Sequence, residues 1–171
     1  MVVNAIQAIE VCGQHQGEIH IRAIRSPQAE LSSSLPDIHS FAVEDNGIGF
    51  TNENRDSFDT LYGDLKLKVG GKGFGRFTCL KYFDNVHVES VFRENGNFLR
   101  RTFCMGREND IIVDEKITPA NEKQAHTVVR LLELKEGKSI DKKLSTVARI
   151  LVEKLLGSPR GGSCLITILM S

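Results

Sequence analysis

Apolar side chains recur along the chain at two spacings, and the spacing changes from one segment to the next. Residues 2–11, 74–83 and 140–156 have the spacing of a helix with one apolar face. Other segments alternate apolar with polar residues or are rich in β-branched residues, which is typical of strands. These predicted strands are residues 18–25, 40–45, 86–92, 98–105, 127–134 and 164–170.

The stretch from residue 51 to residue 69 breaks this pattern. It is largely polar, mixes both charges and has no sustained periodicity. Such a segment predicts a mobile loop that holds at most a short helix. Further along, the strands 86–92, 98–105 and 127–134 follow one another, which favours an antiparallel meander.

Length and charge narrow the class of protein. The chain has 171 residues without an internal repeat or a linker, which predicts a single domain over residues 1–171. Its 22 Lys and Arg balance its 22 Asp and Glu, so no overall charge attracts nucleic acid or acidic lipid. No segment has the length of a membrane span or the form of a signal peptide. We therefore expect a cytoplasmic protein that has no membrane partner and does not bind nucleic acid directly.

The cysteines add little chemistry. They lie far apart and form no C-x-x-C pair, which argues against a zinc site and against a disulfide framework. We expect reduced thiols, most of them in the core. The four are Cys12, Cys79, Cys104 and Cys164.

The segment VEDNGIGF is the first with candidate chemistry. Asp45 ends a predicted strand, and Gly47 and Gly49 flank Ile48. A carboxylate accepts a strong hydrogen bond from an exocyclic amine, and glycines let the backbone approach a flat ring on which Ile48 can pack. The segment therefore suits a buried nucleobase, although Asn46 followed by Gly47 is also a common signal for a hairpin turn.

A second segment, VGGKGFGRF, places glycines directly before a predicted helix. Backbone N–H groups at such a helix start bind phosphate oxygens, and the helix dipole adds to the attraction. The spacing of the glycines matches neither the P-loop nor the dinucleotide-binding fingerprint. Lys72 and Arg76 either meet phosphate charge or stay solvated in a flexible loop.

A third candidate is the first predicted helix. Asn4 and Ala8 share one side of it, among apolar neighbours. An amide oxygen is a suitable ligand for Mg²⁺, which takes few protein ligands when nucleotide phosphates supply the others. The alternative is an Asn that faces solvent or caps the helix.

In this order, the three segments resemble those of the GHKL ATPase superfamily, which includes gyrase, heat-shock chaperones, histidine kinases and MutL. The matching parts are NAIQA, DNGIG, a lid over residues 51–69 and the glycine box GGKGFGRF. Thr127, in HTVVRLLEL, and the charged helix that follows it resemble the chaperone and MutL side most. The resemblance spans roughly residues 2–155. It implies an α/β (α+β) Bergerat-type fold, a two-layer sandwich with helices on one face of a mixed, mainly antiparallel sheet.

The resemblance also implies a site for ATP or ADP with Mg²⁺. It implies that Asn4 coordinates the metal, that Asp45 binds the adenine amine, and that Ile48 and Gly49 line the base. The glycine box would surround the phosphates. The full set of nucleotide-binding candidates is Asn4, Ala8, Asp45, Gly47, Ile48, Gly49, Gly71, Lys72, Gly73, Phe74, Gly75, Arg76 and Thr127.

One departure from the resemblance concerns catalysis. Chaperone and MutL relatives that hydrolyse ATP have a glutamate four residues before the Asn, where it polarises the attacking water. In this sequence that position falls before Met1, and Glu10 points away around the helix. We therefore expect no catalytic residue in residues 1–171, and a chain that lacks its first strand or helix at the amino end.

Three functions remain open at this point. The first is Mg-dependent ATP binding, with slow hydrolysis in a full-length parent that drives a conformational or dimerisation switch, in a homodimer or with a protein partner. The second is a regulatory module that binds nucleotide without hydrolysing it. The third is the catalytic domain of a histidine kinase, although no helical hairpin precedes Asn4.

Overall fold

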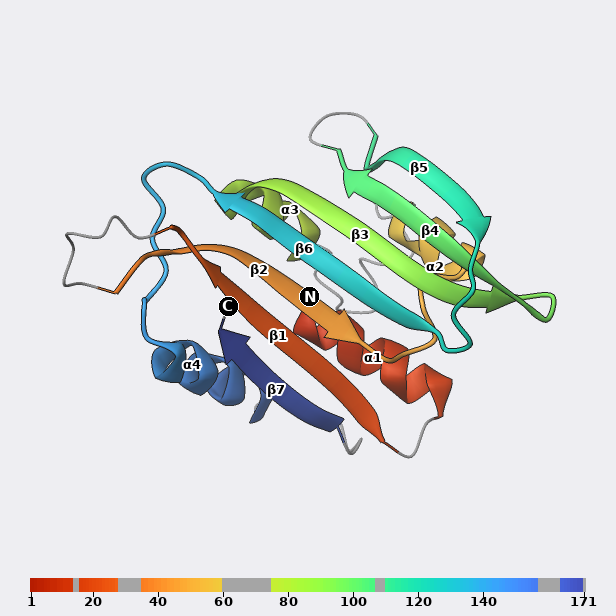
Figure 1. Ribbon diagram of the computed structural model, residues 1–171, viewed down its shortest axis with the longest axis horizontal. Coiled ribbons are helices and arrows are strands. Elements are labelled where there is room, and N and C mark those ends of the chain that lie inside the picture. The colour runs from red at the N-terminus through yellow and green to blue at the C-terminus, as the bar shows by residue number, and fades with distance from the viewer. Residues whose placement is uncertain (14–15, 28–34, 60–74, 107–109, 157–163, 171) are drawn as a thin grey trace, which may run out of the picture.

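A mixed β-sheet lies at the centre of the molecule (Figure 1). The computed structural model describes residues 1–13, 16–27, 35–59, 75–106, 110–156 and 164–170. Over these residues the sheet has seven strands in the order β5-β4-β3-β6-β2-β1-β7. The strands are β1 (Gly17–Arg25), β2 (Ile38–Asp45), β3 (Phe83–Glu94), β4 (Asn97–Met105), β5 (Ile112–Pro119), β6 (His126–Leu134) and β7 (Cys164–Met170).

The strand pairing is antiparallel throughout the described sheet except between β1 and β7, which run parallel. The expected mixed, mainly antiparallel sheet is therefore confirmed. The expected meander is only partly correct, because β6 pairs with β3 and not with β4. The free side of β4 is taken by β5 instead.

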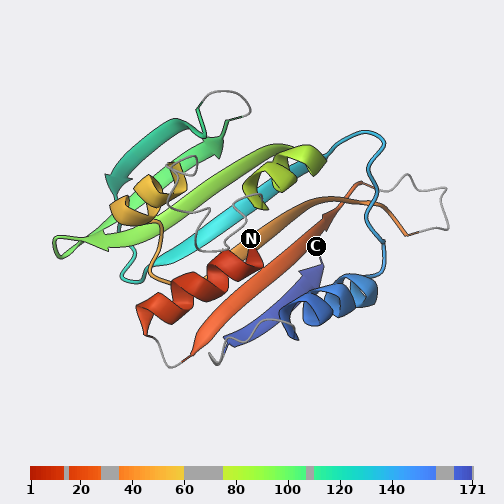
Figure 2. The same ribbon diagram turned by 180° about the vertical axis from the view of Figure 1, so that it is seen from behind.

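Helices cover one face of this sheet, as Figures 1 and 2 show together. They are α1 (Val2–Cys12), α2 (Asn52–Asp59), α3 (Gly75–Tyr82) and α4 (Leu144–Leu156). The first helix lies along β1 and β2, the third lies on β3, and α4 lies beside β7. This arrangement is the two-layer sandwich that the resemblance implied.

The core lies between the two layers. Alternation along β1 turns Ile19, Ile21 and Ala23 toward the helices, while His20 and Arg22 lie on the open face. Helix α1 contributes Ala5 and Ile9 to the same core. Burial of these apolar side chains, at about 25 cal/mol per Å², is what holds the short helices to the sheet.

Strand β5 is an element that the hydrophobic pattern missed. Its sequence, IVDEKITP, is charged in the middle and half-buried or exposed along its whole length. Because β5 is an edge strand that is not buried, its sequence does not have to alternate apolar with polar residues. Its place is set by pairing with β4, in a register that shifts between Thr102 and Cys104.

Two other expectations concern loops and thiols. The first part of the expected lid forms helix α2, in keeping with a segment that holds at most a short helix, and residues 60–69 lie outside the described residues. The four cysteines are free thiols and all are partly exposed, but Cys79 and Cys164 pack against the core, so the expectation that most lie in the core is only partly correct. Within the described part of the chain, no helix is long and apolar enough to cross a membrane.

Candidate functional site

Asp45 is a buried carboxyl group at the end of β2. Its side chain and backbone together are 6% exposed. Burial raises the pKa of Asp45 from 3.8 to about 7, with a smaller increase from Glu44, while the hydrogen bond from the Gly47 N–H lowers it. That N–H lies 3.0 Å from Oδ1, and none of the described groups donates a hydrogen bond to Oδ2. Asp45 therefore keeps an acceptor oxygen for a ligand.

The loop after Asp45 is tied to two neighbouring elements. The Asn46 Oδ1 accepts a hydrogen bond from the Glu18 N–H at 2.8 Å, at the start of β1. The Ile48 N–H donates to the carbonyl of Ala8 on α1, with an N to O distance of 3.2 Å. The chain then continues into α2, so the alternative of a hairpin turn at Asn46 and Gly47 is wrong.

The two glycines of DNGIG make room for the protein itself. A Cβ on Gly47 would lie 2.7 Å from the Cβ of Ala8. At Gly49, φ is +80°, and a Cβ would lie 2.3 Å from the carbonyl oxygen of Val91 on β3. The loop is thus packed between α1 and the sheet, which is a different reason for glycine from the approach to a flat ring that the sequence suggested.

Thr127 lies next to Asp45 across the pairing of β2 with β6. It is 8% exposed, and its Oγ1 lies 2.9 Å from the Oγ of Ser90 on β3. The Ser90 hydroxyl donates to the carbonyl of His126 at 2.9 Å and accepts from the Phe50 N–H at 2.7 Å. Because a hydroxyl has one proton, Thr127 must donate to Ser90, which leaves its own lone pairs free to accept.

The structure describes Asn4 but only the last part of the glycine box. The side chain of Asn4 is exposed on α1, as the solvent-facing alternative predicts, and one helical turn separates it from Ala8. Gly75 and Arg76 form the first turn of α3, so a helix does begin at the end of the glycine box. Gly71, Lys72, Gly73 and Phe74 lie outside the described residues. Among the described residues, no cluster of His, Cys, Asp and Glu could hold a metal ion.

The structure brings together some predicted residues and adds others. Asp45, Gly47, Ile48, Gly49, Ala8 and Thr127 meet where β2, β6 and α1 come together. Ser90 was missed, although alternation places it on the inward face of β3 with Val86 and Val88. A hydroxyl in that apolar row was the available signal. Asn54 was also missed, and its Nδ2 donates to the carbonyl of Gly49 at 3.1 Å.

Comparisons with known proteins find similarity in structure. No protein-family model matches the chain, and no curated protein matches its sequence. The ATPase region of Saccharomyces cerevisiae topoisomerase II superposes with a TM-score of 0.58 at 16% identity, covering 97% of this chain and 45% of that chain. The ATPase and transducer domains of DNA topoisomerase II from Balamuthia mandrillaris give 0.57 at 17% identity, covering 98% and 44%.

These likenesses show the fold. The chain shares the fold of these topoisomerase II ATPase regions over almost its whole length, which agrees with the fold that the resemblance implied. The chain spans less than half the length of either. The expected closeness to the chaperone and MutL side stays a prediction.

The packing of Gly49 predicts a large cost for adding one methyl group. Gly49→Ala should lower the free energy of unfolding by about 3 kcal/mol or more, because it combines a left-handed φ with a backbone clash at Val91. Gly96 is the matched control, since its φ of +84° is similar and nothing lies within 4 Å of a Cβ there. Gly96→Ala should cost only about 1 kcal/mol. Urea unfolding measures both, and equal losses would contradict this account of the loop.

The pKa of Asp45 predicts how stability changes with pH. Since the folded-state pKa is raised, protonated Asp45 favours the folded state, and this contribution is lost as the pH rises from about 4 through 7. Asp45→Asn keeps the acceptor for the Gly47 N–H and carries no charge. At pH 8 the variant should be more stable than the wild type by up to about 4 kcal/mol, and at pH 4 the two should be similar. Urea unfolding at both values tests this, and a difference independent of pH would contradict it.

Proposed function

We propose that this domain binds adenine nucleotides with Mg²⁺ on the helical face of the sheet, beside the Asp45 loop. The observation that carries the proposal is the buried carboxyl of Asp45 with its unoccupied Oδ2 acceptor. The exocyclic amine of adenine donates to such an oxygen, and the charge strengthens that bond. Thr127 offers a second acceptor from the neighbouring strand.

The remaining candidates are assigned from the sequence and from their placement. Ile48 and Gly49 lie in the held loop and would contact the base, and Gly47 would shape that loop. Asn4 fits a Mg²⁺ ligand, because its amide oxygen is exposed and makes no hydrogen bond among the described residues. The phosphate-binding candidates are Gly71, Lys72, Gly73, Phe74, Gly75 and Arg76.

In a longer parent protein, we infer that nucleotide binding drives a conformational or dimerisation switch, accompanied by slow ATP hydrolysis. Support comes from the matched structures, both of which are described as ATPase regions or domains of topoisomerase II. Nucleotide can shift such an equilibrium only if it binds one state more tightly than the other. The loop held between α1 and the sheet allows such a difference in affinity, because a ligand bound there would contact elements that lie far apart in the chain.

Discrimination between ATP and GTP tests the role of Asp45. Guanine has a carbonyl where adenine has its amine, so GTP should bind at least ~10-fold more weakly than ATP in the presence of Mg²⁺. Asp45→Asn should weaken ATP binding by a similar factor. Isothermal titration calorimetry at pH 8 measures both. Glu44→Gln is the control, since the neighbouring Glu44 lies on the open face of the sheet and should leave affinity unchanged. Equal affinities for ATP and GTP would refute the proposal.

ATP hydrolysis should be slow even when ATP saturates the site. We propose no general base among residues 1–171, and such a base contributes typically ~10²–10⁴-fold. Saturating ATP should therefore give turnover near background in a phosphate-release assay, while calorimetry shows binding. Rapid hydrolysis that Asp45→Asn abolishes would show that another group acts as the base.

A further inference from the structure

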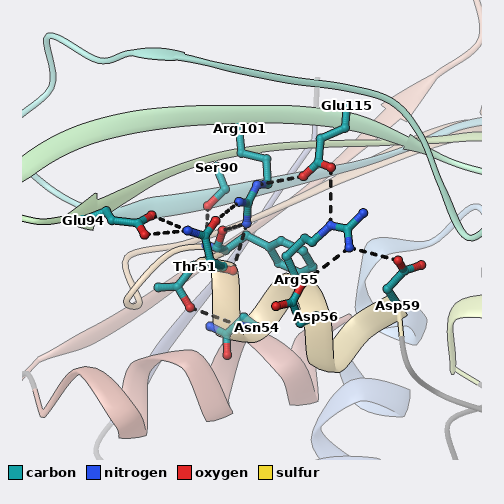
Figure 3. A network of polar contacts seen from close by, with 11 residues as sticks. Thr51, Asn54, Arg55, Asp56, Asp59, Ser90, Glu94, Arg101 and Glu115 are labelled. Carbon is teal, nitrogen blue, oxygen red and sulfur yellow. Dashed lines mark hydrogen bonds and ion pairs between the residues drawn. The ribbon is translucent and has the colours of Figure 1, made fainter. Parts of the chain in front are cut away.

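Arg101 is a charged residue in the core of the domain. It lies on β4, is 1% exposed, and its guanidinium packs over the ring of Phe92 at 4.7 Å from the centroid. Alternation along β4 places it on the helical face with Phe103 and Met105. Figure 3 shows its polar contacts with the chain between the DNGIG loop and α2, and a further contact with Glu115.

These contacts hold the backbone directly after DNGIG. The Nη1 of Arg101 donates to the carbonyl of Phe50 at 2.6 Å and to that of Thr51 at 2.8 Å. Its Nη2 donates to the Oδ1 of Asn52, the first residue of α2. Asn52 in turn donates to the carboxylate of Glu94 on β3. One guanidinium thus fixes three consecutive residues.

Glu115 on β5 balances the buried charge. Its Oε1 lies 3.0 Å from the Nε of Arg101, an ion pair whose atoms are not aligned as a hydrogen bond. Its Oε2 pairs with the Nε of Arg55 at 3.3 Å, which fastens α2 to the same carboxylate. The edge strand that the hydrophobic pattern missed therefore supplies the counter-charge for this part of the site.

The placement of Arg101 indicates more than a stabilising role. A buried ion pair contributes little net stability, and apolar residues of similar volume often replace one without loss. Burial lowers the pKa of Arg101, and Glu115 opposes that shift, so the charge is kept at a cost. The charged guanidinium fixes two backbone carbonyls. They lie beside the loop that the Ile48 hydrogen bond attaches to α1. The loop is held at one end by α1 and at the other by Arg101.

We propose that Arg101 is a positioning residue for the nucleotide site. It holds Ile48 and Gly49 in the conformation that receives the base, and it fixes the start of α2, without touching the ligand itself. This inference rests on the proposed function, because it assigns Arg101 an effect on nucleotide affinity. When the loop is already ordered before binding, no binding free energy is lost in ordering it, so the affinity is higher.

The test compares Arg101→Lys with Arg100→Lys. Arg100 is the matched control, because it is the adjacent residue of β4 and is also ion-paired, to Glu89 and Glu122, on the open face. Lysine keeps the charge but cannot reach all three acceptors of Arg101. Arg101→Lys should lower the affinity for Mg-ATP about 10-fold, the equivalent of one hydrogen bond to a charged group, and Arg100→Lys should leave it unchanged.

Amide hydrogen exchange without nucleotide provides the second readout. The Ile48 and Phe50 amides, bonded to Ala8 and Ser90, should exchange about 10-fold faster in Arg101→Lys than in Arg100→Lys. Folded Arg101→Lys with unchanged exchange or unchanged affinity would overturn the inference. If the wild type binds no nucleotide, the proposed function fails, and exchange alone then decides whether Arg101 holds the loop.

A variant of Asn52, the residue on the other side of the contact with Arg101, tests the inference if Arg101→Lys does not fold. Asn52 is exposed, so Asn52→Ala removes one acceptor of Arg101 without disturbing the core. It should accelerate exchange at Ile48 and Phe50 and weaken Mg-ATP binding in the same direction as Arg101→Lys. Glu53→Ala, at the exposed neighbouring position, should change neither. Identical behaviour of the two variants would overturn the inference even where Arg101→Lys does not fold.

Discussion

The burial of the Asp45 carboxyl is the constraint around which the rest of the site is organised. A carboxylate taken out of water loses several kcal/mol of hydration unless hydrogen bonds replace it. Here one backbone N–H, that of Gly47, provides a partial replacement, and the pKa stays near 7. The folded domain therefore holds an acceptor whose hydrogen bonding is incomplete. Such a group lowers stability and favours a ligand that brings a donor, which is the usual exchange at a binding site.

The loop that follows this carboxyl is held by hydrogen bonds to three elements. Helix α1 accepts the Ile48 N–H, the Ser90 hydroxyl accepts the Phe50 N–H, and Arg101 donates to the carbonyls that follow. Each bond satisfies a backbone group that the loop would otherwise bury unpaired. Gly47 and Gly49 allow the close approach that these bonds need. Two of the polar side chains in the core, Ser90 and Arg101, are thus explained by the backbone of one short segment.

How much of this could be predicted depended on whether a local pattern carried the signal. The helical spacing of residues 2–11 and the alternation around Ile19 and Ile21 were sufficient for α1 and β1. Strand β5 had no such pattern, because an edge strand is placed by pairing and not by burial. The hydrogen-bond partners of Ser90 and Arg101 lie 36 to 51 residues away in the chain and depend on sheet order, which spacing cannot supply.

The order of the strands places this polar site between two parts of the sheet that carry different helices. Strands β1, β2 and β7 carry α1 and α4, whereas β3 carries α3, and Phe58 of α2 packs on Phe103 of β4. The polar row formed by Asp45, Thr127 and Ser90 crosses β2, β6 and β3, where these two halves of the sheet join. Neither half contains all of these contacts. A nucleotide bound to Asp45 and Thr127 would therefore respond to the relative placement of both halves, as coupling between ligand and conformation requires.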